Sequence, residues 1–112
     1  MEQVLRAGQL DRRVQIRRAT LADNGLEQAE TWADHGAPLW ASYAPVGDAE
    51  RWAAGQMQAT RMARFTLRWS PFSADIDAKD RLTFDGREWT ILGAKEIGRR
   101  VSVELTAVAG AD

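Results

Sequence analysis

Apolar and polar residues alternate along most of the chain, which is typical of strands that bury one face of a sheet. The alternation is clearest in residues 61–69, where Phe65 and Leu67 lie on one face. Arg64 and Arg68 occupy the opposite face. Shorter alternating segments of the same kind predict the remaining strands. These segments are residues 10–18, 28–32, 39–46, 82–84, 89–91 and 101–106.

Turn signals separate these segments. Asp85-Gly86 is a dipeptide favoured in type I′ hairpin turns, in which both central residues take positive φ. Asp23-Asn24-Gly25 and Gly98-Arg99-Arg100 predict two further turns. Six to seven short strands with such connections predict an all-β fold, a small antiparallel β-barrel or sandwich, in a single domain of residues 1–112.

Residues 47–62 break the alternation. Alanines and Trp52 recur there at three- and four-residue spacing, without a run of β-branched residues. We therefore expect one short helix or a long mobile loop around residues 47–60, with Asp48 as the helix N-cap. Gly55 weakens the helix by about 1 kcal/mol relative to alanine.

The 112 residues include no cysteine and one histidine, which removes several chemistries. A disulfide scaffold, a cysteine-ligated zinc or iron–sulfur site and a cysteine nucleophile are excluded. His35 lies in a predicted loop, and we interpret it as a satisfied or solvated loop histidine. Residues 75–80 are acidic but lack the central glycine and terminal glutamate of an EF-hand loop, so they predict a solvated turn with local Asx hydrogen bonds. The sequence thus predicts no catalytic residue, no cofactor and no metal site.

Charge is separated into two blocks, although the formal net charge is only −1. Residues 19–50 carry six acidic and no basic side chains, whereas residues 51–74 carry four arginines and no acidic side chain. The near-neutral total argues against nucleic-acid binding by bulk electrostatics. A small barrel that binds single strands by aromatic stacking stays an alternative. No apolar run is long enough for a membrane span or a signal peptide, so no membrane partner is expected.

The tryptophans differ in their surroundings. Trp40, Trp69 and Trp89 lie in alternating segments, and core packing is expected for them. Trp52 lies outside these segments and near Met57. We expect it either to cover the barrel mouth or to dock into a neighbouring subunit. An interface aromatic together with opposed charge blocks favours head-to-tail association into a closed ring.

Several short motifs follow one another along nearly the whole chain. They are Gly8-x-Leu10-x-x-Arg13-Val14-x-Ile16, Asp23-x-Gly25, Trp32, Leu39-Trp40-Ala41, Glu50 and Arg81-Leu82-x-Phe84-Asp85-Gly86-x-x-Trp89-x-Ile91. In order and spacing they resemble the bacteriophage head–tail joining proteins, which are head-closure or stopper proteins that also occur in phage-like gene transfer agents. Each motif alone is common, and their order carries the specificity. Trp89 stands where the family usually has tyrosine, and Leu39 where it often has valine.

The resemblance implies a non-enzymatic structural protein of the virion neck, assembled in the bacterial host cytoplasm. Such a protein forms a ring, dodecameric or hexameric, beneath the portal and closes the DNA-filled head. It extends the DNA channel and provides the platform on which the tail docks. The implied partners are further copies of itself, a portal or adaptor protein above, a tail terminator or tail tube protein below, and DNA that passes without sequence specificity. Adaptor or tail terminator of the same neck is the alternative placement.

No functional site is transferred from the family, since its recurrent residues hold hairpins and core. The residues themselves favour the segment from Asp48 to Arg64 as the source of inter-subunit or channel-facing contacts, because it contains Trp52 and the transition between the two charge blocks. The candidate contact residues are Glu50, Arg51, Trp52, Met57, Arg61 and Arg64.

Overall fold

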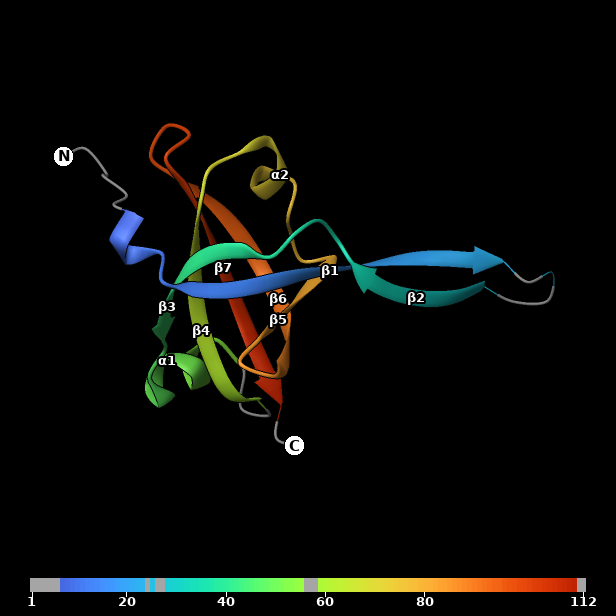
Figure 1. The fold of residues 1–112 in the computed structure, drawn as a ribbon. Coiled ribbons are helices and arrows are strands. Elements are labelled where there is room, and N and C mark those ends of the chain that lie inside the picture. The colour runs from blue at the N-terminus through green and yellow to red at the C-terminus, as the bar shows by residue number, and fades with distance from the viewer. Residues whose placement is uncertain (1–6, 24, 26–27, 56–58, 111–112) are drawn as a thin grey trace.

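The computed structural model describes residues 7–23, 25, 28–55 and 59–110, and it is nearly all β. Seven antiparallel strands and three short helical segments follow one another along the chain (Figure 1). The strands are β1 (Arg12–Asp23), β2 (Gln28–Asp34), β3 (Leu39–Pro45), β4 (Ala59–Arg68), β5 (Asp80–Phe84), β6 (Arg87–Ile97) and β7 (Ser102–Gly110). The helical segments are η1 (Ala7–Gln9), α1 (Asp48–Ala53) and α2 (Pro71–Ala74). The predicted fold class is confirmed.

Six of the strands close into a barrel. The sheet order is β2-β1-β3-β4-β7-β6-β5, and an additional pairing between β1 and β5 joins the two ends of the six-stranded part. The register shifts between Ile91 and Gly93 on β6 and between Ala59 and Arg61 on β4. Such irregularities bend strands, which a small closed sheet requires. Only β2 lies outside the closed part.

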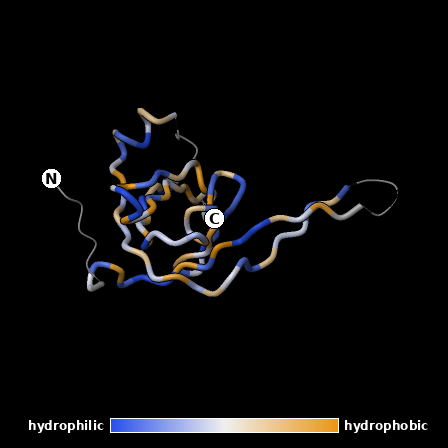
Figure 2. Tube along the Cα trace, turned by 90° about the horizontal axis from the view of Figure 1, so that it is seen from above, coloured by the Kyte–Doolittle hydropathy of each residue, from blue (hydrophilic) through white to orange (hydrophobic). Residues whose placement is uncertain are grey.

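Strand β1 has three partners in succession. Residues 12–14 pair with β3, residues 15–18 pair with β5, and residues 17–23 pair with β2. The second half of β1 therefore leaves the barrel and continues with β2 as a two-stranded ribbon, which we call the arm (residues 19–34, as far as described). The arm projects from the barrel in both views (Figure 1, Figure 2).

The core follows the predicted alternation. Trp89 and Phe65 are fully buried and meet edge to face, with ring centroids 5.3 Å apart. Aliphatic and alanine side chains from all six barrel strands complete the core. They are Val14, Ile16, Ala41, Ala63, Leu67, Leu82, Ile91, Val103, Leu105, Ala107 and Ala109, together with Ile76 from the connection before β5.

The expectation for the other two tryptophans is half right. Trp69 is partly buried and packs against the core, and its indole N–H donates to Glu96 (3.1 Å). Trp40 is 51% exposed, so its predicted core position is wrong. Its neighbour Ala41 is buried on the inner face of β3. Because adjacent strand residues point to opposite faces, Trp40 points outward. The guanidinium of Arg13 lies 4.3 Å from the centre of the Trp40 ring.

The turns at Asp85-Gly86 and Gly98-Arg99-Arg100 are confirmed, and the short helix was predicted with one error. Asn24 of the predicted Asp23-Asn24-Gly25 turn lies outside the described residues. Asp85 (φ 54°) and Gly86 (φ 73°) both have the positive φ of the expected type I′ turn. Helix α1 falls within the predicted residues 47–60, but Gly47 is its N-cap and Asp48 its first residue, with no side-chain cap. Gly55 (φ 76°) follows the C-cap and ends the helix in the left-handed conformation that glycine favours.

Helix α2 was not predicted. Ser70 is its N-cap and forms a capping box with Ser73, and Pro71 follows at the first helical position. A serine cap followed by proline is a recognisable start signal, although the helix ends after one turn. No helix among the described residues is both long and apolar enough to cross a membrane.

A close contact at Gly36 gives a test of the fold. A Cβ at this position, where φ is 75°, would lie 2.5 Å from the ring of Phe72, which packs against the core. We expect Gly36→Ala to lower the free energy of unfolding by about 1 to 2 kcal/mol, through left-handed backbone strain and displacement of this ring. Thermal unfolding followed by circular dichroism measures the change. Gly47→Ala is the control, because nothing lies within 4 Å of its added Cβ; equal melting temperatures for the two variants would contradict this account.

Candidate functional site

An ion pair joins helix α1 to the barrel wall. Glu50 on α1 accepts a hydrogen bond from the guanidinium of Arg64 on β4. Arg64 also lies 3.9 Å from Glu104 on β7. The hydrogen bond from Arg64 lowers the pKa of Glu50, so the pair keeps its charges to lower pH than an isolated glutamate would. Two of the candidate contact residues are thus in direct contact and fix the helix position.

The same helix presents Trp52 to solvent. Arg51 pairs with Asp48 one turn earlier (3.3 Å), and its side chain is largely covered. Trp52 is 56% exposed. A tryptophan that covered the barrel mouth would bury its ring, so this exposure favours docking over covering.

Arg61 and Met57 are the remaining candidate residues of the segment. Arg61, near the start of β4, is exposed and forms no ion pair with any described residue. Met57 lies outside the described residues. The structure therefore brings Glu50, Arg51, Trp52 and Arg64 together on or against α1, with Arg61 on the strand that follows.

A second feature is the arm: the sequence predicts strands at residues 10–18 and 28–32 joined by a turn, but not that they project from the barrel. Its root is a charge cluster around Arg18, the residue at which β1 leaves the barrel. Arg18 donates to both carboxylate oxygens of Asp80 (2.8 and 2.9 Å) and to Asp75 (2.8 Å). Arg18 and Asp80 are also paired in the register of β1 and β5, so the two side chains share one face of the sheet.

Burial makes this cluster different from a surface ion pair. The Asp80 side chain has no exposed area, and that of Arg18 is 22% exposed. The prediction of a solvated acidic turn is therefore wrong for Asp80, because β5 begins at this residue and carries it into the barrel wall. It holds for Asp77, whose exposed carboxylate accepts the backbone N–H of Lys79 (2.9 Å) in an Asx-type turn. The hydrogen bond from Arg18 lowers the pKa of Asp75.

One face of the arm combines apolar and acidic side chains. Cross-strand pairing places Leu21 opposite Glu30 and Trp32 opposite Ala19 on this face. Trp32 packs under the guanidinium of Arg81 (4.1 Å to the ring centre), and its indole N–H donates to Glu30 (3.1 Å). Leu21, farther out, is 65% exposed.

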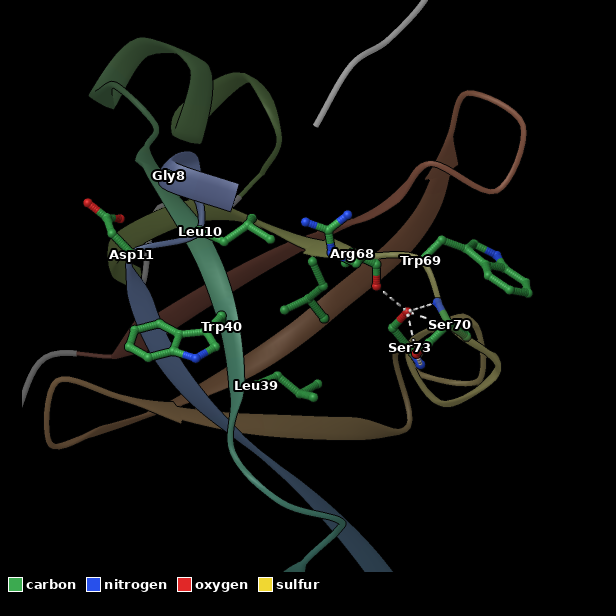
Figure 3. Close-up of a pocket in the computed structure, with 10 residues that line it drawn as sticks. Gly8, Leu10, Asp11, Leu39, Trp40, Arg68, Trp69, Ser70 and Ser73 are labelled. Atoms are coloured by element: carbon green, nitrogen blue, oxygen red, sulfur yellow. Dashed lines mark hydrogen bonds between the residues drawn. The ribbon is translucent and has the colours of Figure 1, made fainter. Parts of the chain in front are cut away.

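An apolar pocket lies beside the start of β1, and we call it the N-terminal pocket (Figure 3). Its volume is about 720 Å³. Leu10 and Leu39 lie between Trp40 and Trp69 in the view of Figure 3. The lining residues are Gly8, Leu10, Asp11, Leu39, Trp40, Leu67, Arg68, Trp69, Ser70 and Ser73.

Three arginines lie at or near this pocket. Arg68 lines it, Arg13 covers the Trp40 ring, and the guanidinium of Arg100 lies 5.1 Å from the centre of the Trp69 ring. The acidic lining residue Asp11 lies 3.6 Å from Arg12. The pocket therefore has an apolar floor, one basic and one acidic lining residue, and two arginines that contact its tryptophans.

These features suit binding to other macromolecules. Among the described residues, no three histidine or carboxylate side chains are grouped so that they could hold a metal ion. His35 is half-buried and stacks on Phe72, with ring centroids 5.0 Å apart, while its backbone N–H donates to the carbonyl of Ile16.

The sequence signal that could have revealed the arm is the polar character of residues 28–34, which offer no face for burial.

Comparisons with known proteins place the chain among phage structural proteins. The family model described as "Phage head completion protein" matches residues 5–110. The structure is similar to the solution structure of protein SF1141 from Shigella flexneri 2a, with TM-score 0.74, 28% identity, and coverage of 96% of this chain and 99% of that one. It also resembles a chain in a structure titled "Virion of native gene transfer agent (GTA) particle", with TM-score 0.63, 19% identity, and coverage of 91% and 96%. No curated protein sequence matches the chain.

The charge cluster at the arm root predicts unequal roles for two adjacent arginines. Arg18→Met leaves the Asp80 carboxylate buried without its guanidinium, so we expect a loss of about 3 kcal/mol in the free energy of unfolding. Arg17→Met removes the pair with the exposed Asp34 and a hydrogen bond to the Trp32 carbonyl (3.3 Å), and it is expected to cost about 1 kcal/mol. Urea unfolding of both variants gives the comparison. A loss at Arg18 no larger than that at Arg17 would show that the cluster does not anchor the arm.

Proposed function

This chain belongs to the phage head completion protein family, and from that premise we propose that it forms a ring beneath the portal. The ring closes the DNA-filled head, extends the DNA channel and gives the tail its docking platform. The observation that carries this proposal is the family match over residues 5–110. The confirmed resemblance to head-closure proteins points to the same structural role in the virion neck.

The distribution of surface features supports assembly into a ring. The exposed Trp52 on α1 and the arm lie on different sides of the barrel (Figure 1). A subunit with unlike contact surfaces on different sides associates head to tail, and such contacts close into a ring when the rotation between neighbours allows it. The partners are then other copies of this chain, dodecameric or hexameric, with a portal or adaptor protein above and a tail terminator or tail tube protein below.

The segment from Asp48 to Arg64 supplies inter-subunit or channel-facing contacts in this proposal. The ion pair between Glu50 and Arg64 holds α1 in place, and this rigidity reduces the entropy lost when Trp52 docks. Arg61, near the start of β4, adds an exposed positive charge. The full set of contact residues is Glu50, Arg51, Trp52, Met57, Arg61 and Arg64.

Passage of DNA through the ring requires no sequence recognition and no catalysis. The protein acts as a structural element of the virion neck, without enzymatic activity. The neck is assembled in the bacterial host cytoplasm. Placement as an adaptor or a tail terminator of the same neck differs only in the neighbour above or below. Electron microscopy of complete particles, in which the barrel is located in the neck density, distinguishes these placements.

The head-closing role is tested directly on heads that lack the protein. Packaged heads assembled without it should lose DNA on storage, become sensitive to nuclease and fail to join tails. Addition of the purified protein should restore DNA retention and produce a ring with an open or gated axial channel below the portal. If the purified protein never joins portal-bearing heads and persists as a monomer in their presence, the proposed function is wrong.

The contact segment is tested by Trp52→Ala combined with Arg61→Glu. Because both side chains are exposed, we expect an unchanged fold but a loss of ring assembly on portal-bearing heads, at least about tenfold by ring occupancy, from the lost apolar burial and the reversed charge. Native mass spectrometry and particle images measure the occupancy. Leu92→Ala with Arg99→Glu changes an exposed apolar residue and an exposed arginine elsewhere, and it is the matched control. Normal rings from the Trp52 double variant would exclude this segment.

A further inference from the structure

We propose that the arm of each subunit docks into the N-terminal pocket of the next subunit in the ring, with Leu21 as the apolar anchor. This inference rests on the proposed ring. It adds a contact that uses neither α1 nor the segment from Asp48 to Arg64. The occupant of the pocket is a second copy of this chain.

The two halves of this contact lie at opposite ends of one strand. Leu10 and Asp11, which line the pocket, immediately precede β1, whereas the arm is formed by the second half of β1 with β2. Ten residues of extended strand from Asp11 to Leu21 span roughly 33 Å. The arm therefore points away from the pocket of its own subunit and cannot fill it (Figure 1, Figure 2). Donor and acceptor at opposite ends are what a head-to-tail contact needs.

The arm has the properties of a segment that is completed by a partner. A two-stranded ribbon is marginally stable alone and leaves unpaired backbone groups along its edges. Beyond the barrel, β1 and β2 pair only with each other among the described residues. Leu21 is the most exposed large apolar side chain in the described part of the chain, at 65%. Burying it on a neighbour removes this apolar surface from water and so favours association.

The pocket offers the matching surface. Its floor of leucine and tryptophan side chains can take an aliphatic anchor, and its volume of about 720 Å³ exceeds that of a single leucine side chain, so backbone of the arm can enter as well. Leu10, Leu39 and Leu67 are the aliphatic lining residues. Trp40, which is 51% exposed, borders the pocket, and an arm docked there would cover its ring.

The charge of the arm also suits it as the occupant of the pocket. The arm lies within residues 19–50, which carry no lysine or arginine, and it presents Glu30 beside Leu21. Glu30 forms no ion pair with any described residue. Arg68 and Asp11 are the charged residues that line the pocket, and Arg13 and Arg100 lie over the rings of the lining residues Trp40 and Trp69. An arm that has no basic side chain and carries Glu30 beside its apolar anchor is complementary to these arginines and to the apolar floor, and such complementarity fixes orientation.

The cysteine-free sequence allows a direct test by crosslinking. Two single variants, Leu21→Cys on the arm and Asp11→Cys at the pocket, are mixed, assembled on portal-bearing heads and treated with a short bis-maleimide. We expect a crosslinked dimer from the mixture and none from either variant alone. Thr20→Cys replaces Leu21→Cys in the control, since Thr20 is exposed on the other face of the arm, and several-fold less dimer is expected.

The outcomes separate this inference from the proposed ring. Rings that assemble normally but give no Leu21→Cys to Asp11→Cys dimer would overturn the arm contact and leave the ring proposal standing. Crosslinks of Leu21→Cys to itself, or to a portal or tail protein, would also overturn it. Failure to find any ring on the heads would overturn the proposed function and the arm contact with it.

A second pair of variants tests the anchor without introduced thiols. Leu21→Glu removes the apolar anchor, and we expect at least about tenfold lower ring occupancy, the factor that corresponds to the lost burial. Thr20→Glu adds the same charge one residue away on the opposite face, and occupancy close to that of the unmodified protein is expected. Both substitutions are at exposed positions, so unchanged melting temperatures confirm that the fold is intact. Equal occupancy for the two variants would remove Leu21 from the interface.

Discussion

The exit of β1 from the barrel at Arg18 is the point on which both the closed sheet and the arm depend. Pairing of residues 15–18 with β5 closes the barrel, and pairing of residues 17–23 with β2 builds the arm. One strand thus belongs to two structures, and the change of partner occurs over two residues. The buried carboxylate of Asp80 lies opposite Arg18 at this junction.

A buried ion pair contributes little net stability, because the desolvation of both charges offsets their attraction. Its effect on register is larger. A shift of β1 by one residue against β5 would move Arg18 to the other face of the sheet and leave Asp80 buried without a partner. The same shift would expose Ile16, which is fully buried in the observed register. The core and the ion pair therefore select one register, and that register sets the residue at which the arm begins.

The strands could be predicted from the sequence because their apolar faces are regular, as in Phe65 and Leu67 on β4. The order of strands around the barrel could not, since alternation does not say which strand is the neighbour. Trp40 shows a further limit: in the alternation either Trp40 or Ala41 could face the core, and the large residue is the natural choice. The pocket was also unpredictable, because η1, β3, β4 and α2 contribute to it from distant parts of the sequence.

Some charges of the two blocks form ion pairs within the subunit, and others do not. Asp34, Asp48 and Glu50 of the acidic block pair with Arg17, Arg51 and Arg64 of the same subunit. Glu30 and Arg61 form no ion pair with described residues of their own subunit. Intramolecular pairing thus orders the arm root and α1, and the charges left over lie on the surfaces that meet neighbours in the proposed ring. A single arm tip or a single tryptophan is a small contact, well below the area of a stable pairwise interface. Under this arrangement free subunits associate weakly, whereas a platform that holds several of them raises their effective concentration and lets all contacts form together.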